Sequence, residues 1–174
     1  MSAISFQTKL YNIGSWTILH LPQTASSKLP SRGQTMVKGS INGAGFESPL
    51  EPDGNWSHWL KLDKELMTAA AVKSGDRVSV SLIPINNWTE PLVPSYLKKS
   101  LAASPKAHQL WIIITPLARW EWVRWIRSTA NTETRNRRVK VAISKLESGE
   151  RRPCCWNRNL CTEPEVSKNG ILLA

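Results

Sequence analysis

The chain has 174 residues, of which 41% are hydrophobic and 21% are charged, and its formal net charge is +10 at pH 7. A chain of this length and composition is globular and can bury a hydrophobic core, so it does not need a disulfide scaffold. The charge is compatible with anionic partners but identifies none of them.

The positive charge is concentrated in the middle of the chain. Residues 1–85 contain 8 basic and 6 acidic side chains, residues 86–148 contain 11 and 4, and residues 149–174 contain 4 and 3. The N-terminus has no basic start followed by an apolar run, and no stretch approaches the roughly 20 apolar residues of a membrane-spanning helix. Two of the three cysteines are adjacent, which fits a reducing compartment better than a disulfide framework. We therefore expect a cytoplasmic protein without a membrane span.

The first half of the chain shows strand patterns separated by turn signals. Residues 15–21 alternate between two faces with a period of two, and Pro22 ends the pattern. Residues 34–50 predict a hairpin, because Asn42-Gly43 suits the two positive φ angles that a type I′ turn requires.

Further strand signals follow the hairpin. Residues 58–62 form an apolar stretch that leads into a short helix, which Asp63 is expected to cap. A Gly-Asp turn then precedes alternating residues at 77–82. Short strands without crossover helices favour a small closed or half-closed β-barrel over a parallel sheet. We expect the large indole rings in this half to pack in its core or rim rather than to stack on a ligand; these are Trp16, Trp56 and Trp59.

The second half of the chain predicts three helices. The first is expected to be capped by Ser95, and the second to start at Thr115-Pro116, because proline at the first helical position loses no hydrogen bond. Projection of the second helix at 100° per residue places Trp122 and Trp125 in the core. The opposite face carries Trp120, Arg124 and Arg127, where the indole can lie under either guanidinium as an exposed cation–π contact.

The third predicted helix is basic. It is capped near Asn131 or Thr132 and ends at Gly149, with apolar residues at the i, i+3, i+4, i+7 spacing. Arg137 and Lys140 face outward, whereas Arg138 flanks the apolar stripe and Arg135 falls on it. A half-buried guanidinium must be paired, and Glu133, Glu121 or a helix-end carbonyl would serve. Arg135 is then an internal clip between helices or, alternatively, a site of anion capture.

Two sets of motifs, taken in order, resemble the bacterial YdeI/OmpD-associated, or bacteriocin-protection, family fused to an N-terminal domain of unknown function. The N-terminal set is WTILHLP, VKGSINGAGFESPLEPDGNWSHWLKL and GDRVSVSL. The C-terminal set is VPSYLKKSL and RWIRSTANTETRNRR, with LESGERRPCC behind it. Its most recognisable motif covers Glu133, Thr134, Arg135 and Arg138, which we take as candidates for a structural clip or an anion site.

The resemblance implies an α+β fold. Residues 1–88 would form a double-split β-barrel of the class shared with AbrB-like transcription regulators. Residues 89–149 would form a helical module of about three helices, and residues 150–174 a Cys- and Arg-containing tail. It also implies a link to protection against bacteriocins or antimicrobial peptides, with no established catalytic residue to carry over.

The residue patterns favour binding over catalysis. The sequence contains no nucleophile elbow, metalloprotease helix, phosphate-binding loop or dinucleotide glycine pattern, so we expect a non-enzymatic protein without a cofactor. Cys154, Cys155 and Cys161 are weak metal candidates, since they lack the paired spacing of a structural zinc site.

Two hypotheses for function remain. The first is a protein-interaction module with an unidentified partner. The alternative is nucleic-acid binding, in which basic and aromatic side chains of the second and third predicted helices contact phosphates and bases; these are Trp120, Arg124, Arg127, Arg137 and Lys140.

Overall fold

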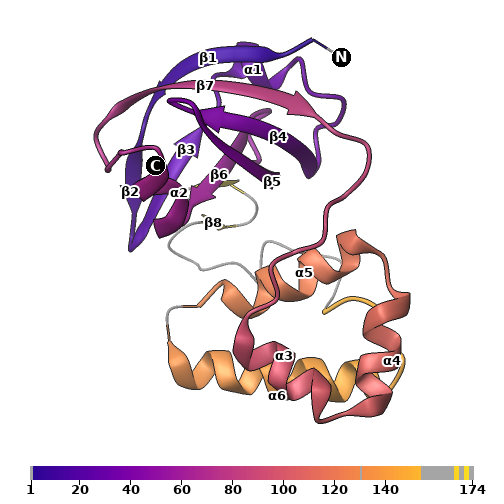
Figure 1. Cartoon of the computed structure of the whole chain (residues 1–174). Helices are drawn as coiled ribbons and strands as arrows, with labels where there is room; N and C mark the ends of the chain where they lie inside the picture. The colour runs from indigo at the N-terminus through magenta and orange to yellow at the C-terminus, as the bar shows by residue number, and fades with distance from the viewer. Residues whose placement is uncertain (1, 130, 154–166, 169–170, 173–174) are drawn as a thin grey trace. The chain divides into compact units, whose positions relative to one another are not determined.

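The computed structural model describes residues 2–129, 131–153, 167–168 and 171–172 of the chain (Figure 1). These residues divide into two compact units. One runs to Asn87 and includes the two short strands near the C-terminus, and the other begins at Trp88. The first unit is a curled antiparallel sheet and the second is helical, so the predicted α+β class is confirmed. Cys154, Cys155 and Cys161 lie outside the described residues.

The first unit is built on a seven-stranded antiparallel sheet with the strand order β1-β7-β4-β5-β6-β3-β2. The strands are β1 (Ile4–Lys9), β2 (Tyr11–Ile13), β3 (Trp16–His20), β4 (Thr35–Ile41), β5 (Ala44–Pro52), β6 (His58–Leu62) and β7 (Arg77–Pro84). The two edge strands, β1 and β2, are separated in the chain by Leu10 alone, and Thr8 Oγ1 donates to the His20 carbonyl at 3.0 Å. The sheet therefore curls into a half-barrel around a core that includes Leu10, Leu19, Leu50 and Leu82.

Local sequence signals account for the tight turns of this unit. Asn42 and Gly43 have φ angles of 48° and 89°, which confirms the prediction for the β4–β5 hairpin. Gly39 is required on β4, because a Cβ there would lie 2.6 Å from a Leu82 methyl carbon and from the Ser81 carbonyl oxygen. Asp63 accepts a hydrogen bond of 2.8 Å from the Leu66 amide and caps α2 (Lys64–Ala69), as predicted.

The sequence patterns missed some elements of this unit. Neither β1, β2 nor the short helix α1 (Gln23–Ser26) was predicted, because short edge strands and a single helical turn carry little periodicity. Trp16 and Trp59 are buried as predicted, with ring centroids 6.3 Å apart. The prediction for Trp56 is wrong, since its side chain is 73% exposed.

The described residues of the second unit form four helices rather than about three: α3 (Ser95–Ala102), α4 (Pro105–Ile113), α5 (Pro116–Arg127) and α6 (Thr132–Glu147). The missed helix, α4, has a start signal of its own, because the Ser104 hydroxyl accepts from the Ala107 amide and Pro105 occupies the first turn. Ser104 Oγ also donates to Glu147 at 2.6 Å and ties the start of α4 to the end of α6. The predicted Ser95 cap is wrong, since Pro94 occupies the N-cap position without a side-chain hydrogen bond.

The ends of α5 and α6 follow their sequence signals. Thr115 caps α5 through the Ala118 amide, and Asn131 caps α6 through the Thr134 amide. Gly149 has a φ of 92° and its amide donates to Leu146, while the Glu150 amide donates to the Lys145 carbonyl, which is a Schellman termination of α6. The helices pack around Leu97, Trp111, Trp122, Ile126, Ala142 and Leu146. Among the described residues no helix has the length and apolar character to cross a membrane.

Candidate functional site

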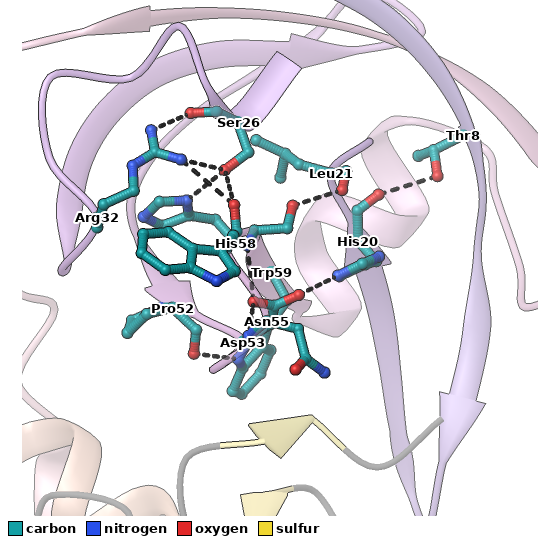
Figure 2. A network of polar contacts seen from close by, with 12 residues as sticks. Thr8, His20, Leu21, Ser26, Arg32, Pro52, Asp53, Asn55, His58 and Trp59 are labelled. Carbon is teal, nitrogen blue, oxygen red and sulfur yellow. Dashed lines mark hydrogen bonds and ion pairs between the residues drawn. The ribbon is translucent and has the colours of Figure 1, made fainter. Parts of the chain in front are cut away.

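A polar network fills one part of the first unit, and it begins at the loop between β5 and β6 (Figure 2). The buried carboxylate of Asp53 accepts hydrogen bonds from the amides of Asn55 and Ser57 at 2.7 and 2.8 Å. Its second oxygen lies 2.8 Å from His20 Nε2 on β3. Ser57 Oγ donates to the Leu21 carbonyl at 2.7 Å. Asp53 therefore fixes both the loop that follows it and the end of β3.

A second part of the network joins α1 to β6. The Ser26 hydroxyl lies 2.8 Å from Nδ1 of His58, and both residues are fully buried. Nε2 of His58 lies 2.8 Å from the Gly33 carbonyl, which can only accept, so Nε2 carries the proton and Nδ1 accepts from Ser26. Arg32 donates to the carbonyls of Ser26 and Trp56. The neutral imidazole thus holds α1, β6 and the intervening loop together.

The surroundings shift the pKa values of both groups. Burial would raise the pKa of Asp53, but hydrogen bonds from His20 and from the Ser57 and Asn55 amides outweigh it and hold that pKa below its usual value. Burial lowers the pKa of His58 and is the dominant effect, and the Arg32 charge acts in the same direction. The network is therefore stable with Asp53 ionised and His58 neutral.

Serine, histidine and aspartate are the residue types of a hydrolytic triad, but the hydrogen bonds among them here are not those of a triad. Asp53 hydrogen-bonds to His20, whereas the Nε2–H of His58 is committed to a backbone carbonyl. The Ser26 hydroxyl is fully buried, so a substrate carbonyl cannot reach it. The hydrogen bonds of Ser26, His58 and Asp53 hold backbone segments in position. Sequence reasoning did not find the network of Ser26, Asp53 and His58, because Ser26 is distant in sequence from the other two. The only signal for it was the cluster of polar residues at 53–58.

The second unit holds the residues that the sequence singled out. Arg138 on α6 donates from one guanidinium nitrogen to the Trp125 carbonyl and to Ser128 Oγ, both at 2.6 Å, at the C-terminal end of α5. Its guanidinium carbon lies 5.5 Å from the Trp125 ring centroid. Arg138 is therefore the internal clip between α5 and α6, a role that the sequence had suggested for Arg135.

Arg135 is half-buried, as expected from its place on the apolar stripe. Neither predicted carboxylate pairs with it, because Glu133 lies 3.6 Å from Arg137 and Glu121 lies 3.5 Å from Arg152. Instead the guanidinium lies 5.3 Å from the Tyr96 ring centroid and donates to Thr132 Oγ1 at 3.3 Å. Its Nε is buried and has no hydrogen-bond partner among the described residues. Thr134, the remaining motif residue, is half-buried and donates its amide to the Asn131 cap.

The predicted nucleic-acid contacts fall into two groups. Arg137 and Lys140 on α6 and Arg127 on α5 are exposed, as expected for solvent-facing cations. Arg124 is half-buried. Trp120 is also half-buried rather than exposed, because its Nε1 donates to the Thr89 carbonyl at 2.7 Å, so its indole is a poor candidate for stacking.

Each acidic side chain in the described part of the second unit, residues 88–153, contacts another side chain of that unit. Glu90 receives two hydrogen bonds from Arg119, at 2.6 and 2.7 Å, a pairing that no sequence pattern indicates. The remaining acids contact Arg152, Arg137, Ser104 and Lys145; they are Glu121, Glu133, Glu147 and Glu150. Residues 88–153 contain 13 basic and 5 acidic side chains, so an excess of positive charge faces solvent on this unit. Among the described residues no group of three His, Cys, Asp or Glu side chains could hold a metal ion.

Comparison with known families assigns each unit. Residues 6–82 match a domain of unknown function, DUF1905, and residues 90–149 match the family described as bacteriocin-protection, YdeI or OmpD-associated. Neither match extends over the whole chain, so the helical unit is similar to that bacteriocin-protection family and the sheet unit is similar to the domain of unknown function. The resemblance inferred from the motifs is thereby confirmed for both parts of the chain, and Arg138 and the exposed cations of α6 lie within the bacteriocin-protection domain. A search of curated proteins found no match.

Proposed function

We propose that this protein, whose helical unit is similar to the bacteriocin-protection family, acts in the cytoplasm as a non-enzymatic binding protein, and that its helical unit contacts an acidic partner. The observation that supports this best is the division of its polar groups. The groups with catalytic potential, Ser26, His58 and Asp53, are consumed in internal hydrogen bonds. The cations Arg137 and Lys140 face solvent.

The family description links such proteins to protection against bacteriocins. Binding of an acidic protein would follow from the excess of positive charge on the helical unit, because complementary charges accelerate encounter and select partners. Arg137 and Lys140 are three residues apart on α6 and are therefore neighbours on its surface. They form the cationic face of α6, the name used below for this pair.

The test is survival of a bacterial host that expresses the protein and is exposed to graded doses of a cationic antimicrobial peptide. We expect expression to raise the dose that kills half of the cells. The Ser26→Ala variant should keep that protection to within about twofold, provided that circular dichroism shows it folded. A folded Ser26→Ala variant without protection would point to a chemical role for the hydroxyl and would contradict the proposal.

A second candidate is nucleic-acid binding through the same cationic face of α6. The exposure of Arg137 and Lys140 favours it. The AbrB-like barrel class, which the resemblance implies for the sheet unit, includes transcription regulators and points the same way by analogy of fold alone.

Fluorescence anisotropy of labelled DNA and RNA at two salt concentrations tests this candidate. Phosphate contacts predict binding that weakens steeply with salt and that falls in Arg137→Ala/Lys140→Ala. An affinity that does not change with salt concentration, or no binding at low salt, would leave the acidic-protein partner as the better proposal.

A further inference from the structure

Trp56 has an energetically unfavourable backbone conformation and an exposed side chain. It follows Gly54 and Asn55 in the β5–β6 loop, its φ is 66°, and its side chain is 73% exposed. A positive φ is unfavourable for any residue with a Cβ and most unusual for a bulky one, while glycine adopts it freely. The exposed indole gains little from burial in return. Among the described residues the only other non-glycine positions with positive φ are Asn42, in the hairpin turn, and Ala71.

The network in Figure 2 holds this unfavourable backbone in place. Asp53 accepts from the amides of Asn55 and Ser57, on either side of Trp56, and the Asp53 amide donates to the Ser57 carbonyl at 3.0 Å. The Trp56 carbonyl accepts from Arg32 at 3.3 Å; Ser26 Oγ, whose proton goes to His58, lies 3.5 Å from it. The indole therefore projects from a fixed loop, and a ligand would bind it without first having to order the loop.

The surroundings of Trp56 indicate which ligand chemistry suits it. Its neighbours in the chain are Gly54, Asn55 and Ser57, and the exposed cation Arg32 contacts its carbonyl. An apolar protein pocket or a bilayer would call for further apolar surface beside the ring. An indole among polar residues, next to an exposed arginine, suits a planar group joined to an anion.

We propose that Trp56 is a stacking platform for an unpaired base of single-stranded nucleic acid, with Arg32 beside it for a backbone phosphate. Bases within a duplex are stacked on one another and offer no free face to the ring, so the site selects single strands. This inference rests on the second candidate function and adds to it a separate contact on the sheet unit.

The test is anisotropy of a labelled 12-nucleotide poly-U or poly-dT strand with the full chain and with Trp56→Gly. Trp56→Gly should weaken binding about tenfold, because one base can no longer stack. It should also raise the Tm, because glycine adopts the positive φ of this position without strain. The matched control is Ala71→Gly, where φ is 52° and the side chain is small and exposed. It should raise the Tm similarly and leave the affinity unchanged. Trp56→Phe should retain part of the affinity, since it keeps an aromatic face.

The outcomes distinguish the Trp56 stacking platform from nucleic-acid binding by the cationic face of α6. If the wild type binds single strands and Trp56→Gly binds equally well, the stacking platform is refuted, while a loss in Arg137→Ala/Lys140→Ala would still support the second candidate. Equal losses in Trp56→Gly and Ala71→Gly would also refute it, because the effect would then come from the backbone. No binding by the wild type at low salt would refute both.

Discussion

Arg138 provides the sharpest test of how the helical unit is held together. Replacement by alanine removes its hydrogen bonds to the Trp125 carbonyl and Ser128 Oγ, which are both 2.6 Å long, and its contact with the Trp125 ring. Hydrogen bonds to a charged group contribute about 1.5–3 kcal/mol, and a partly exposed cation–π contact about 0.5–1 kcal/mol. Because these contributions overlap, we expect Arg138→Ala to lower the free energy of unfolding by about 2–4 kcal/mol.

The neighbouring residue offers a matched control. The Arg137 side chain is 71% exposed and lies 3.6 Å from Glu133 one turn away, so Arg137→Ala should cost less than about 0.5 kcal/mol. Arg138→Lys should fall between the two, because an ammonium keeps the charge but not the planar donor geometry. Urea unfolding followed by circular dichroism at 222 nm reports on the helices. Equal costs for Arg137→Ala and Arg138→Ala, or a cost below about 1 kcal/mol for Arg138→Ala, would refute the internal clip.

Three further predictions concern burial, a helix end and pH. Trp122→Ala should cost about 3–5 kcal/mol, measured by the same urea unfolding, because this indole is fully buried in the helical core. Gly149→Ala should cost about 1–2 kcal/mol at a φ of 92°, whereas an unchanged urea midpoint would exclude strain there. The lowered pKa of His58 contributes stability that is complete above the usual value of 6.5 and is lost as pH falls toward the folded-state pKa. The Tm should therefore fall between pH 7.5 and 5.0, a range above the lowered pKa of Asp53, and should fall less in His58→Gln than in the exposed control His108→Gln.

Features encoded by adjacent residues could be predicted from the sequence. Asn42-Gly43 defined the hairpin, and Thr115-Pro116 defined the start of α5, because each depends on the conformational preference of one or two residues. The cap at Asn131 and the stop at Gly149 bounded α6 for the same reason. A strong start signal was also present for α4 at Ser104-Pro105, but the apolar stretch behind it obscured the helical period.

Features that depend on tertiary neighbours could not be predicted in this way. Arg135 falls on the apolar stripe of α6 and Arg138 flanks it, and only the position of the α5 C-terminus decides which guanidinium acts as the clip. The pairing of Ser26 with His58 spans 32 residues and requires the sheet to curl first. The exposure of Trp56 likewise follows from a loop conformation that its residue type disfavours.

The central claim is that the solvent-facing cations of the helical unit, rather than the buried network, carry the function. Its most direct test is protection of a peptide-challenged host by Arg137→Glu/Lys140→Glu, a reversal of the cationic face of α6 that leaves the Arg138 clip in place. We predict that this variant remains folded by circular dichroism and loses protection, while Ser26→Ala retains it. Full protection by the charge-reversed variant, together with loss in a folded Ser26→Ala, would contradict the account.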